Sequence, residues 1–186
     1  MMDSEVKNME LMEKKLSEKE VYKGRIVRLH VDEVELPDGK TALREIVDHP
    51  GGVGILAMDD DGRVMMVQQY RYAFGKTMWE IPAGKREPGE EPLETAKREL
   101  QEEAGATAER WMPLGEIIPS PGCYGEKLYL FMARGLTFGE RHLDEDEFLT
   151  VSRLPMVELI RGCVSGEIQD AKTVIAVLKA KYMMGI

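Results

Sequence analysis

Residues 84–106 read GKREPGEEPLETAKRELQEEAGA, and the interpretation of the whole chain depends on this stretch. Pro92 suits the first turn of a helix, and Gly105 suits the position just after its end. Between them, apolar residues recur at spacings of three and four, as in the buried face of a helix: Leu93, Ala96, Leu100 and Ala104. The stretch therefore predicts a helix that packs against a sheet.

Several carboxylates are crowded onto this predicted helix. Glu99 and Glu103 are four residues apart, so one lies above the other beside the buried face, and Glu102 lies further round. Like charges at this spacing repel each other and destabilise an isolated helix. A hard divalent cation such as Mg²⁺ would compensate them, because it binds carboxylate and phosphate oxygens. The alternative is a solvated acidic surface, balanced by Lys97 and Arg98.

The full spacing of the stretch fits a longer pattern, G-x5-E-x7-R-E-U-x-E-E-x-G-U, in which U is a bulky apolar residue. The matching positions are Gly84, Glu90, Arg98, Glu99, Leu100, Glu102, Glu103 and Gly105, and Ala106 matches the last position weakly. Seven fixed positions coincide by chance with a probability on the order of 10^-8 per start position. This pattern is the Nudix box. The chain therefore resembles the Nudix hydrolases, which cleave a nucleoside diphosphate linked to another group.

The resemblance implies roles for individual residues of the box. It assigns divalent-metal binding to two helix carboxylates and to the backbone carbonyl before the box glycine: Glu99, Glu103 and Ala83. Glu102 lies beside them and is a candidate catalytic carboxylate. Arg98 is expected to have a structural role, because a guanidinium next to Glu90 can hold carboxylates in place with paired hydrogen bonds.

The reaction of this family is the attack of water on one phosphorus of a pyrophosphate, which requires a group to accept a proton. In relatives that hydrolyse ADP-ribose, this base often lies in a loop outside the box. The acidic loop 144–147 resembles that loop, and Glu145 and Glu147 are the candidates for the base. The alternative is a solvated acidic turn.

Residues on either side of the box resemble the ADP-ribose pyrophosphatase branch of the family: 69–72, 79–84 and Pro121. Arg71 is suited to bind a diphosphate, and Glu80 is suited to hold polar groups of the nucleotide. For the neighbouring aromatic residues, packing in the core is slightly preferred over substrate binding: Tyr70, Tyr72 and Trp79.

The resemblance thus predicts a pyrophosphohydrolase that uses Mg²⁺, or alternatively Mn²⁺, to convert ADP-ribose into AMP and ribose 5-phosphate. Other substrates of the same kind, GDP-mannose or NADH, remain alternatives. A further alternative is a nucleotide-sensing protein that has kept the fold and lost catalysis. The intact box disfavours it, because such proteins usually carry a degraded box.

Three segments are expected along the chain: a polar N-terminal arm at 1–20, an antiparallel β-subdomain at 21–48, and a Nudix domain at 49–186. The arm is expected to form a short helix or a mobile segment. Two helices are expected at the end, at 156–164 and 171–183. The pattern agrees with the α/β/α sandwich and mixed sheet of Nudix proteins. The resemblance also implies a homodimer built with the N-terminal strands.

Composition restricts the class of protein. The formal net charge of −9 argues against a protein that coats nucleic acid or acidic membranes. Cys123 and Cys163 suggest neither a disulfide framework nor a zinc site, which favours the reducing cytoplasm. We expect neither secretion nor membrane insertion, because no apolar run is long enough. The three histidines are expected to be isolated surface or packing residues: His30, His49 and His142.

Overall fold

The structure is a computed structural model that describes residues 11–143 and 147–185. These residues fall into two compact units, which are described separately. The N-terminal unit comprises Met1–His49 with Ser120–Glu126, and the larger unit comprises Pro50–Pro119 with Lys127–Ile186.

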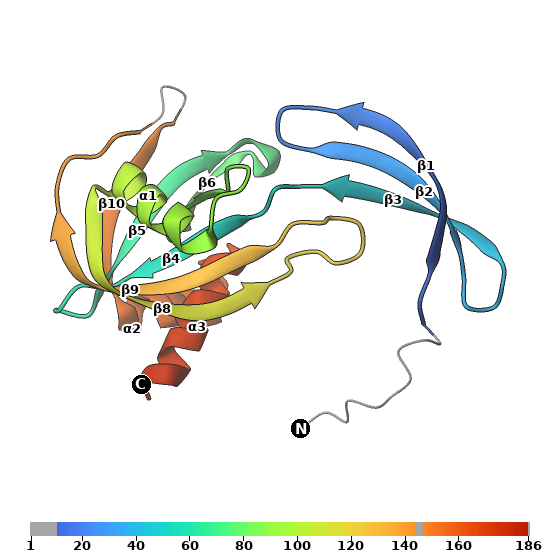
Figure 1. The fold of residues 1–186 in the computed structure, drawn as a ribbon. Coiled ribbons are helices and arrows are strands. Elements are labelled where there is room, and N and C mark those ends of the chain that lie inside the picture. Colours follow the sequence, from blue (N-terminus) through green and yellow to red (C-terminus); the bar gives the residue numbers. More distant parts are fainter. Residues whose placement is uncertain (1–10, 144–146, 186) are drawn as a thin grey trace. The chain divides into compact units, whose positions relative to one another are not determined.

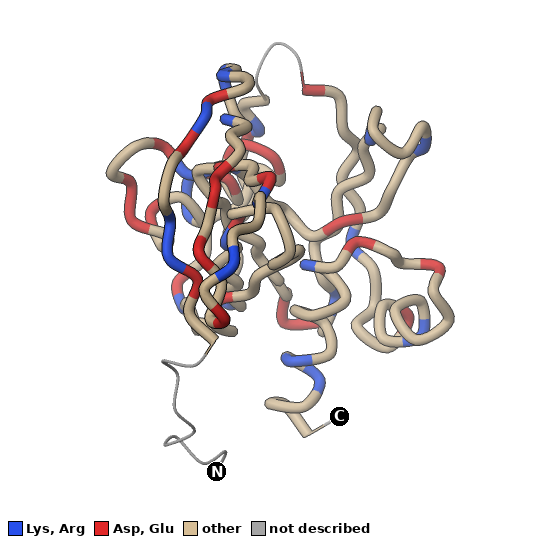
Figure 2. Tube along the Cα trace, turned by 90° about the vertical axis from the view of Figure 1, so that its right-hand side faces the viewer, with Lys and Arg blue, Asp and Glu red and all other residues tan. Residues whose placement is uncertain are grey.

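The N-terminal unit contains a three-stranded antiparallel sheet in the order β1-β2-β3, with bounds Lys14–Lys23, Arg28–Glu35 and Thr41–Asp48 (Figure 1). Acidic and basic residues are interleaved along these strands (Figure 2). The turn between β2 and β3 includes Gly39, whose positive φ of 82° favours glycine.

The start of β1 corrects one prediction. Residues 14–20 form a strand and are neither a short helix nor an arm, so the expected boundary between residues 20 and 21 falls inside β1. Every residue of β1 is exposed, and the strand is held by its backbone pairing with β2 and by cross-strand ion pairs. Lys15 pairs with Asp32, and Glu18 pairs with Arg28. Residues 1–10 lie outside the described part of the chain.

The larger unit is built on two sheets. One has the order β7-β4-β9-β8, and the other has the order β10-β5-β6. β4 and β9 run parallel, whereas the other neighbours are antiparallel, so the first sheet is mixed. The strands are β4 Gly52–Ala57, β5 Arg63–Arg71, β6 Lys76–Glu80, β7 Ala83–Lys85, β8 Ala106–Ile117, β9 Leu128–Phe138 and β10 Leu149–Pro155. The helices are α1 Pro92–Ala104, α2 Met156–Ser165, α3 Ala171–Met184 and the short 3₁₀ helix η1 Tyr72–Phe74.

The helices cover both faces of the mixed sheet (Figure 1). All six residues of β4 are buried, as expected for a strand with both faces covered. Val53, Ile55 and Ala57 pack in one cluster with the apolar face of α1, and Leu56 packs in another cluster with α2 and α3. The predicted α/β/α sandwich is therefore confirmed.

The ends of α1 follow from its sequence. Pro92 occupies the first turn, and Gly105 adopts the left-handed conformation with a φ of 60°. A Cβ atom at Gly105 would lie 2.7 Å from the carbonyl oxygen of Gly139, so a side chain is also excluded sterically. β8 begins at once with Ala106, which is buried in the cluster around α1. The small residue at this weakly matching box position therefore fits its packing.

The two C-terminal helices were predicted to within one residue at each end. None of the helices in the described part of the chain is long and apolar enough to cross a membrane.

Candidate active site

Strand β7 and helix α1 bring the two central box carboxylates to the same piece of backbone. The Ala83 N–H donates a hydrogen bond of 2.8 Å to Oε2 of Glu103. A Cβ atom at Gly84 would lie 1.9 Å from Cδ and Oε1 of Glu99. A side chain at the box glycine would therefore displace the Glu99 carboxylate, which lies directly against the α-carbon of Gly84.

The electrostatics of these carboxylates are unfavourable in the protein alone. Glu103 is only 3% exposed, and burial raises its pKa to about 8, with a further contribution from the charges of Glu99 and Glu147. Burial also raises the pKa of Glu99 to about 6, although the adjacent Arg98 opposes this shift. Both carboxylates would be stabilised in their charged form by additional positive charge.

Arg98 organises the outer part of the site. Its Nε and Nη2 atoms donate to the two carboxylate oxygens of Glu90, each at 3.1 Å. Its Nη1 atom donates to Glu99 at 2.9 Å and to Glu102 at 2.8 Å. The hydrogen bonds from Arg98 lower the pKa of Glu90 to about 2. Glu90 is therefore held as a charged partner of Arg98.

The inner carboxylates fit a divalent cation. Within the described part of the chain, Glu103 receives the one hydrogen bond from Ala83, and no cationic side chain forms an ion pair with it. Its neighbour Glu99 is also largely buried. Mg²⁺ takes oxygen ligands, and a cation beside these side chains would supply the positive charge that the fold leaves out.

Of the candidates for the base, the structure places Glu147 near the inner carboxylates. Its negative charge contributes to the raised pKa values of Glu99 and Glu103. Glu147 is half-buried and lies two residues before β10. Glu145 lies outside the described residues. Glu102 is partly exposed and forms an ion pair with Arg98.

Arg71 and Glu80 form a second group at the ends of β5 and β6. The Nε and Nη2 atoms of Arg71 donate to the two carboxylate oxygens of Glu80, both at 2.6 Å. Glu80 is only 2% exposed and also forms an ion pair with Lys172 of α3. The pKa of Arg71 is raised, chiefly by its hydrogen bonds to Glu80, and the negative charge of Glu103 contributes. Arg71 thus lies within electrostatic reach of Glu103.

Sequence reasoning missed the third element of this group, at the start of α3. Lys172 pairs with both Glu80 and Asp170, and Asp170 caps the helix by accepting a hydrogen bond from the Thr173 N–H. A lysine in the first turn of a helix opposes the helix dipole, which is a local signal that it has a specific partner. The partner itself lies 92 residues away in the sequence.

The exposure of the other residues near the box agrees only in part with the prediction. Tyr70 and Tyr72 are 59% and 91% exposed, so the slight preference for core packing is wrong for both of them. Trp79 does pack against the core cluster. Pro121 is exposed and belongs to the N-terminal unit.

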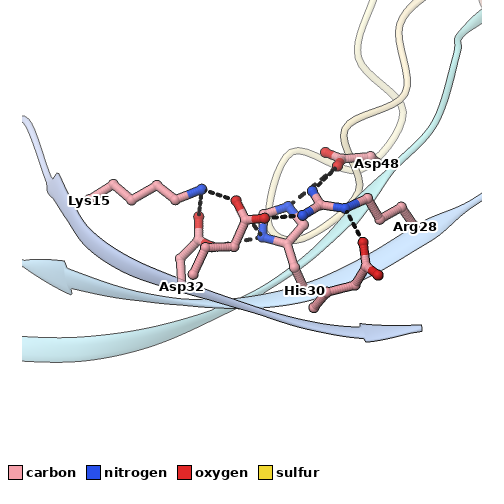
Figure 3. A network of polar contacts seen from close by, with 7 residues as sticks. Lys15, Arg28, His30, Asp32 and Asp48 are labelled. Atoms are coloured by element: carbon pink, nitrogen blue, oxygen red, sulfur yellow. Dashed lines mark hydrogen bonds and ion pairs between the residues drawn. The ribbon is translucent and has the colours of Figure 1, made fainter. Parts of the chain in front are cut away.

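His30 is not isolated, contrary to expectation. Its side chain lies with those of Glu18 and Asp32, and ligand atoms of all three lie within 4.8 Å of one another (Figure 3). However, Lys15 forms an ion pair with Asp32 at 3.1 Å, and Arg28 forms one with Glu18. Because Lys15 and Arg28 already pair with these carboxylates, the cluster suits a metal ion less well than Glu103 does, for which no ion pair is formed within the described residues.

An acidic helix held against a glycine-containing strand, within an α/β/α sandwich, is an arrangement suited to a hydrolase that works with a bound divalent cation. The model of the NUDIX domain matches residues 48–175. The model of the nucleoside diphosphate sugar hydrolase N-terminal domain matches residues 13–47. The chain belongs to the Nudix family.

Similar proteins cover nearly the whole chain. It is 43% identical over 169 residues to the ADP-ribose pyrophosphatase of Bacillus subtilis (strain 168), which covers 90% of this chain and 91% of that protein. It is 44% identical over 167 residues to the methanol dehydrogenase activator of Bacillus methanolicus, with coverages of 89% and 90%. The ADP-ribose pyrophosphatase of Mycobacterium tuberculosis (strain ATCC 25618 / H37Rv) is 38% identical over 167 residues, with coverages of 88% and 80%.

The fold is also similar to that in the crystal structure of an ADP compounds hydrolase. The TM-score is 0.82 at 21% sequence identity, and the match covers 93% of this chain and 94% of the other. Together these similarities confirm the predicted fold, the predicted family and the assignment to hydrolases of phosphorus-containing anhydrides.

Proposed function

We propose that this protein is a Mg²⁺-dependent pyrophosphohydrolase that cleaves ADP-ribose into AMP and ribose 5-phosphate. The observation that carries the proposal is the pair of buried carboxylates, Glu99 and Glu103, held against the backbone of Ala83 and Gly84 without a protein cation on Glu103. The choice of ADP-ribose is supported by two relatives with that activity in their names, at 43% and 38% identity.

The metal would be held by Glu99, Glu103 and the carbonyl oxygen of Ala83. When bound, Mg²⁺ or Mn²⁺ supplies positive charge to the phosphate oxygens and lowers the pKa of a bound water. Arg98 would keep Glu99 in place by binding it together with Glu90 and Glu102. Because Glu99 and Glu103 would bind the metal, a different carboxylate would accept the proton from water.

Glu147 is our preferred base, because its charge already acts on both inner carboxylates. A carboxylate at this position could accept a proton from the attacking water. Glu145 and Glu102 are the other candidates for this role.

Arg71 would bind the diphosphate. Glu80 engages the Nε and Nη2 atoms of its guanidinium, so the group is fixed along one edge. The Nη1 atom forms no hydrogen bond with the described residues and would bind a phosphate oxygen. Pro121 is proposed as a further substrate-binding residue, on the basis of its position in the sequence. Glu80 would support binding through Arg71 or contact the nucleotide itself.

We further propose a homodimer built with the N-terminal unit. All ten residues of β1 are exposed, and a three-stranded sheet with an exposed edge strand commonly pairs with another chain. Large apolar side chains are also exposed on this unit, including Leu16, Val21 and Leu43. Light scattering of the purified protein would test this, and a monomeric mass would overturn it.

The two free cysteines support a reducing compartment such as the cytoplasm.

The decisive experiment measures AMP release from ADP-ribose with Mg²⁺, in parallel with GDP-mannose and NADH, and with a chelated control. We expect rapid AMP formation from ADP-ribose that disappears when the metal is removed. Preference for GDP-mannose or NADH would keep the hydrolase and overturn the substrate. Tight binding of ADP-ribose without turnover would instead indicate a nucleotide sensor.

A further inference from the structure

Lys172 lies at the centre of a buried network of charged groups in the larger unit. It is 8% exposed, and its Nζ atom pairs with Glu80 and, at 3.0 Å, with Asp170. Glu80 in turn holds Arg71 through two hydrogen bonds of 2.6 Å. The network therefore connects the first turn of α3 to the arginine proposed to bind the diphosphate.

The first turn of α3 is fixed to the end of β6 by a separate contact. The Ile81 N–H donates a hydrogen bond of 2.9 Å to Oγ1 of Thr173. The aliphatic part of Lys172 passes over β4, where a Cβ atom at Gly54 would lie 3.7 Å from Cδ of Lys172. Lys172 is thus held by packing as well as by its ion pairs, and its ammonium group has a defined position.

The position of Lys172 in the first turn is unfavourable for the stability of α3. The N-terminal end of a helix carries partial positive charge, so a cation in the first turn is unfavourable there, and burial increases the cost. Asp170 and Glu80 offset these effects. A lysine that stabilised α3 alone would be better placed at the other end of the helix, as Lys181 is.

The charges in the network balance only when Lys172 is present. Arg71 and Lys172 contribute two positive charges, and Glu80 and Asp170 contribute two negative charges, so the sum is 2 − 2 = 0. Without Lys172 the sum becomes 1 − 2 = −1. The charge of Arg71 would then be outweighed by the two carboxylates, which would weaken its attraction for an anionic diphosphate.

We propose that Lys172 is a positioning residue, which fixes Glu80 and offsets its charge so that Arg71 can bind the diphosphate of the substrate. This inference rests on the proposed function and assigns a role in it to a residue outside the Nudix box. Lys172 acts through Glu80 and Arg71 and makes no contact with the phosphates in this scheme. Its loss should therefore weaken substrate binding more than it slows the chemical step.

The test compares Lys172→Met with Lys172→Arg in the full-length protein. Two quantities are measured: KM and kcat for ADP-ribose, and the Kd of α,β-methylene-ADP-ribose by calorimetry. We expect Lys172→Met to raise KM and Kd about tenfold, which is the ordinary effect of one charge-assisted hydrogen bond. The value of kcat should change less than about threefold. Lys172→Arg should restore most of the loss, because it keeps the charge. Lys179→Met, an exposed lysine on the same helix, is the matched control and should behave like wild type.

A double-mutant cycle with Arg71→Ala separates positioning from general destabilisation. If Lys172 acts through Arg71, adding Lys172→Met to Arg71→Ala should raise KM and Kd less than about twofold. An equal rise in both backgrounds would overturn the proposal, and so would a fall in kcat at unchanged KM. If Lys172→Met does not fold, Lys172→Gln carries the same test.

The outcome for wild type distinguishes this inference from the proposed function. Binding of the analogue without hydrolysis of ADP-ribose would refute the pyrophosphohydrolase but still allow the cycle to be measured by calorimetry. If wild type neither hydrolyses ADP-ribose nor binds the analogue, both proposals fail.

Discussion

The substitution Glu103→Gln should have opposite effects on stability and on activity. Burial raises the pKa of Glu103 to about 8 in the metal-free protein, compared with 4.5 for an ordinary glutamate. A group with a raised pKa contributes its full stability below pH 4.5, and the contribution is lost as the pH rises through 8. Glutamine is neutral at every pH, and its carbonyl oxygen can still accept the hydrogen bond from Ala83. The variant should therefore escape this pH-dependent loss.

The magnitude follows from the same shift. The difference of about 3.5 pKa units corresponds to about 5 kcal/mol above pH 8, and linkage leaves about 3 kcal/mol at pH 7. For a chain of this size, each kcal/mol shifts the melting temperature by about 2–4 °C. Metal-free Glu103→Gln should therefore melt roughly 6–12 °C above wild type at pH 7, and near the wild-type temperature at pH 4.5.

The assay is thermal unfolding by circular dichroism with a chelator, across this pH range, followed by the same scans with Mg²⁺. Wild type should be stabilised by Mg²⁺ and the variant much less, because the variant lacks one carboxylate ligand. Turnover of ADP-ribose at saturating Mg²⁺ should fall by about 100-fold or more. Glu94→Gln is the matched control on the same helix: Glu94 is exposed and pairs with Lys97, so both stability and turnover should stay nearly unchanged.

Two results would refute this reasoning. If the metal-free variant is no more stable than wild type at pH 8, the Glu103 carboxylate is not destabilising in the fold. If the variant keeps full turnover at saturating Mg²⁺, Glu103 is not a metal ligand.

Three further predictions concern other parts of the molecule. Gly84→Ala should abolish hydrolysis while circular dichroism shows that the helices remain, because a Cβ atom would lie 1.9 Å from the Glu99 carboxyl group; normal turnover would contradict this. Arg98→Met should lower stability at neutral pH and make it less dependent on pH between 4.5 and 2, because the variant lacks the pairing that acid disrupts in wild type. The pKa of Glu90 is lowered to about 2 by Arg98, so Glu90 contributes stability above pH 4.5 that is lost as the pH falls toward 2; identical acid unfolding curves would count against the pairing. His30→Gln should leave the Mg²⁺ concentration for half-maximal hydrolysis unchanged, and a large increase would show that the His30 cluster contributes to the metal requirement.

The elements with local signals could be predicted from sequence. Helix α1 has a proline at its start and a glycine after its end, and these residues mark its bounds in the sequence. The bounds predicted for α3 agree with the structure within one residue. The spacing of Glu99 and Glu103 likewise placed them on one side of α1. These features depend on residues close together in the chain.

The features that were missed depend on distant partners. Strand β1 has no buried face, so it lacks apolar alternation, and its stability comes from charged partners on β2. Lys172 meets Glu80 only because α3 packs against the mixed sheet of β4, β9 and β8, which brings the first turn of α3 to the end of β6. The exposure of Tyr72, which begins the short helix η1, also has no signal in the neighbouring sequence. The first two of these features can be explained only by contacts between residues that are distant in the sequence.

Strand β4 limits which positions of this enzyme can change during evolution. Its backbone is the common support for both functional groups: a Cβ atom at Gly52 would lie 2.6 Å from the Gly84 carbonyl oxygen, and Gly54 lies beneath Lys172. Substitutions at these two glycines would disturb, from within the core, the residues proposed to bind the metal and those proposed to bind the diphosphate. Adaptation to a new nucleotide should therefore accumulate in exposed positions such as Tyr70 and Tyr72, while β4 stays fixed across descendants and in laboratory selection.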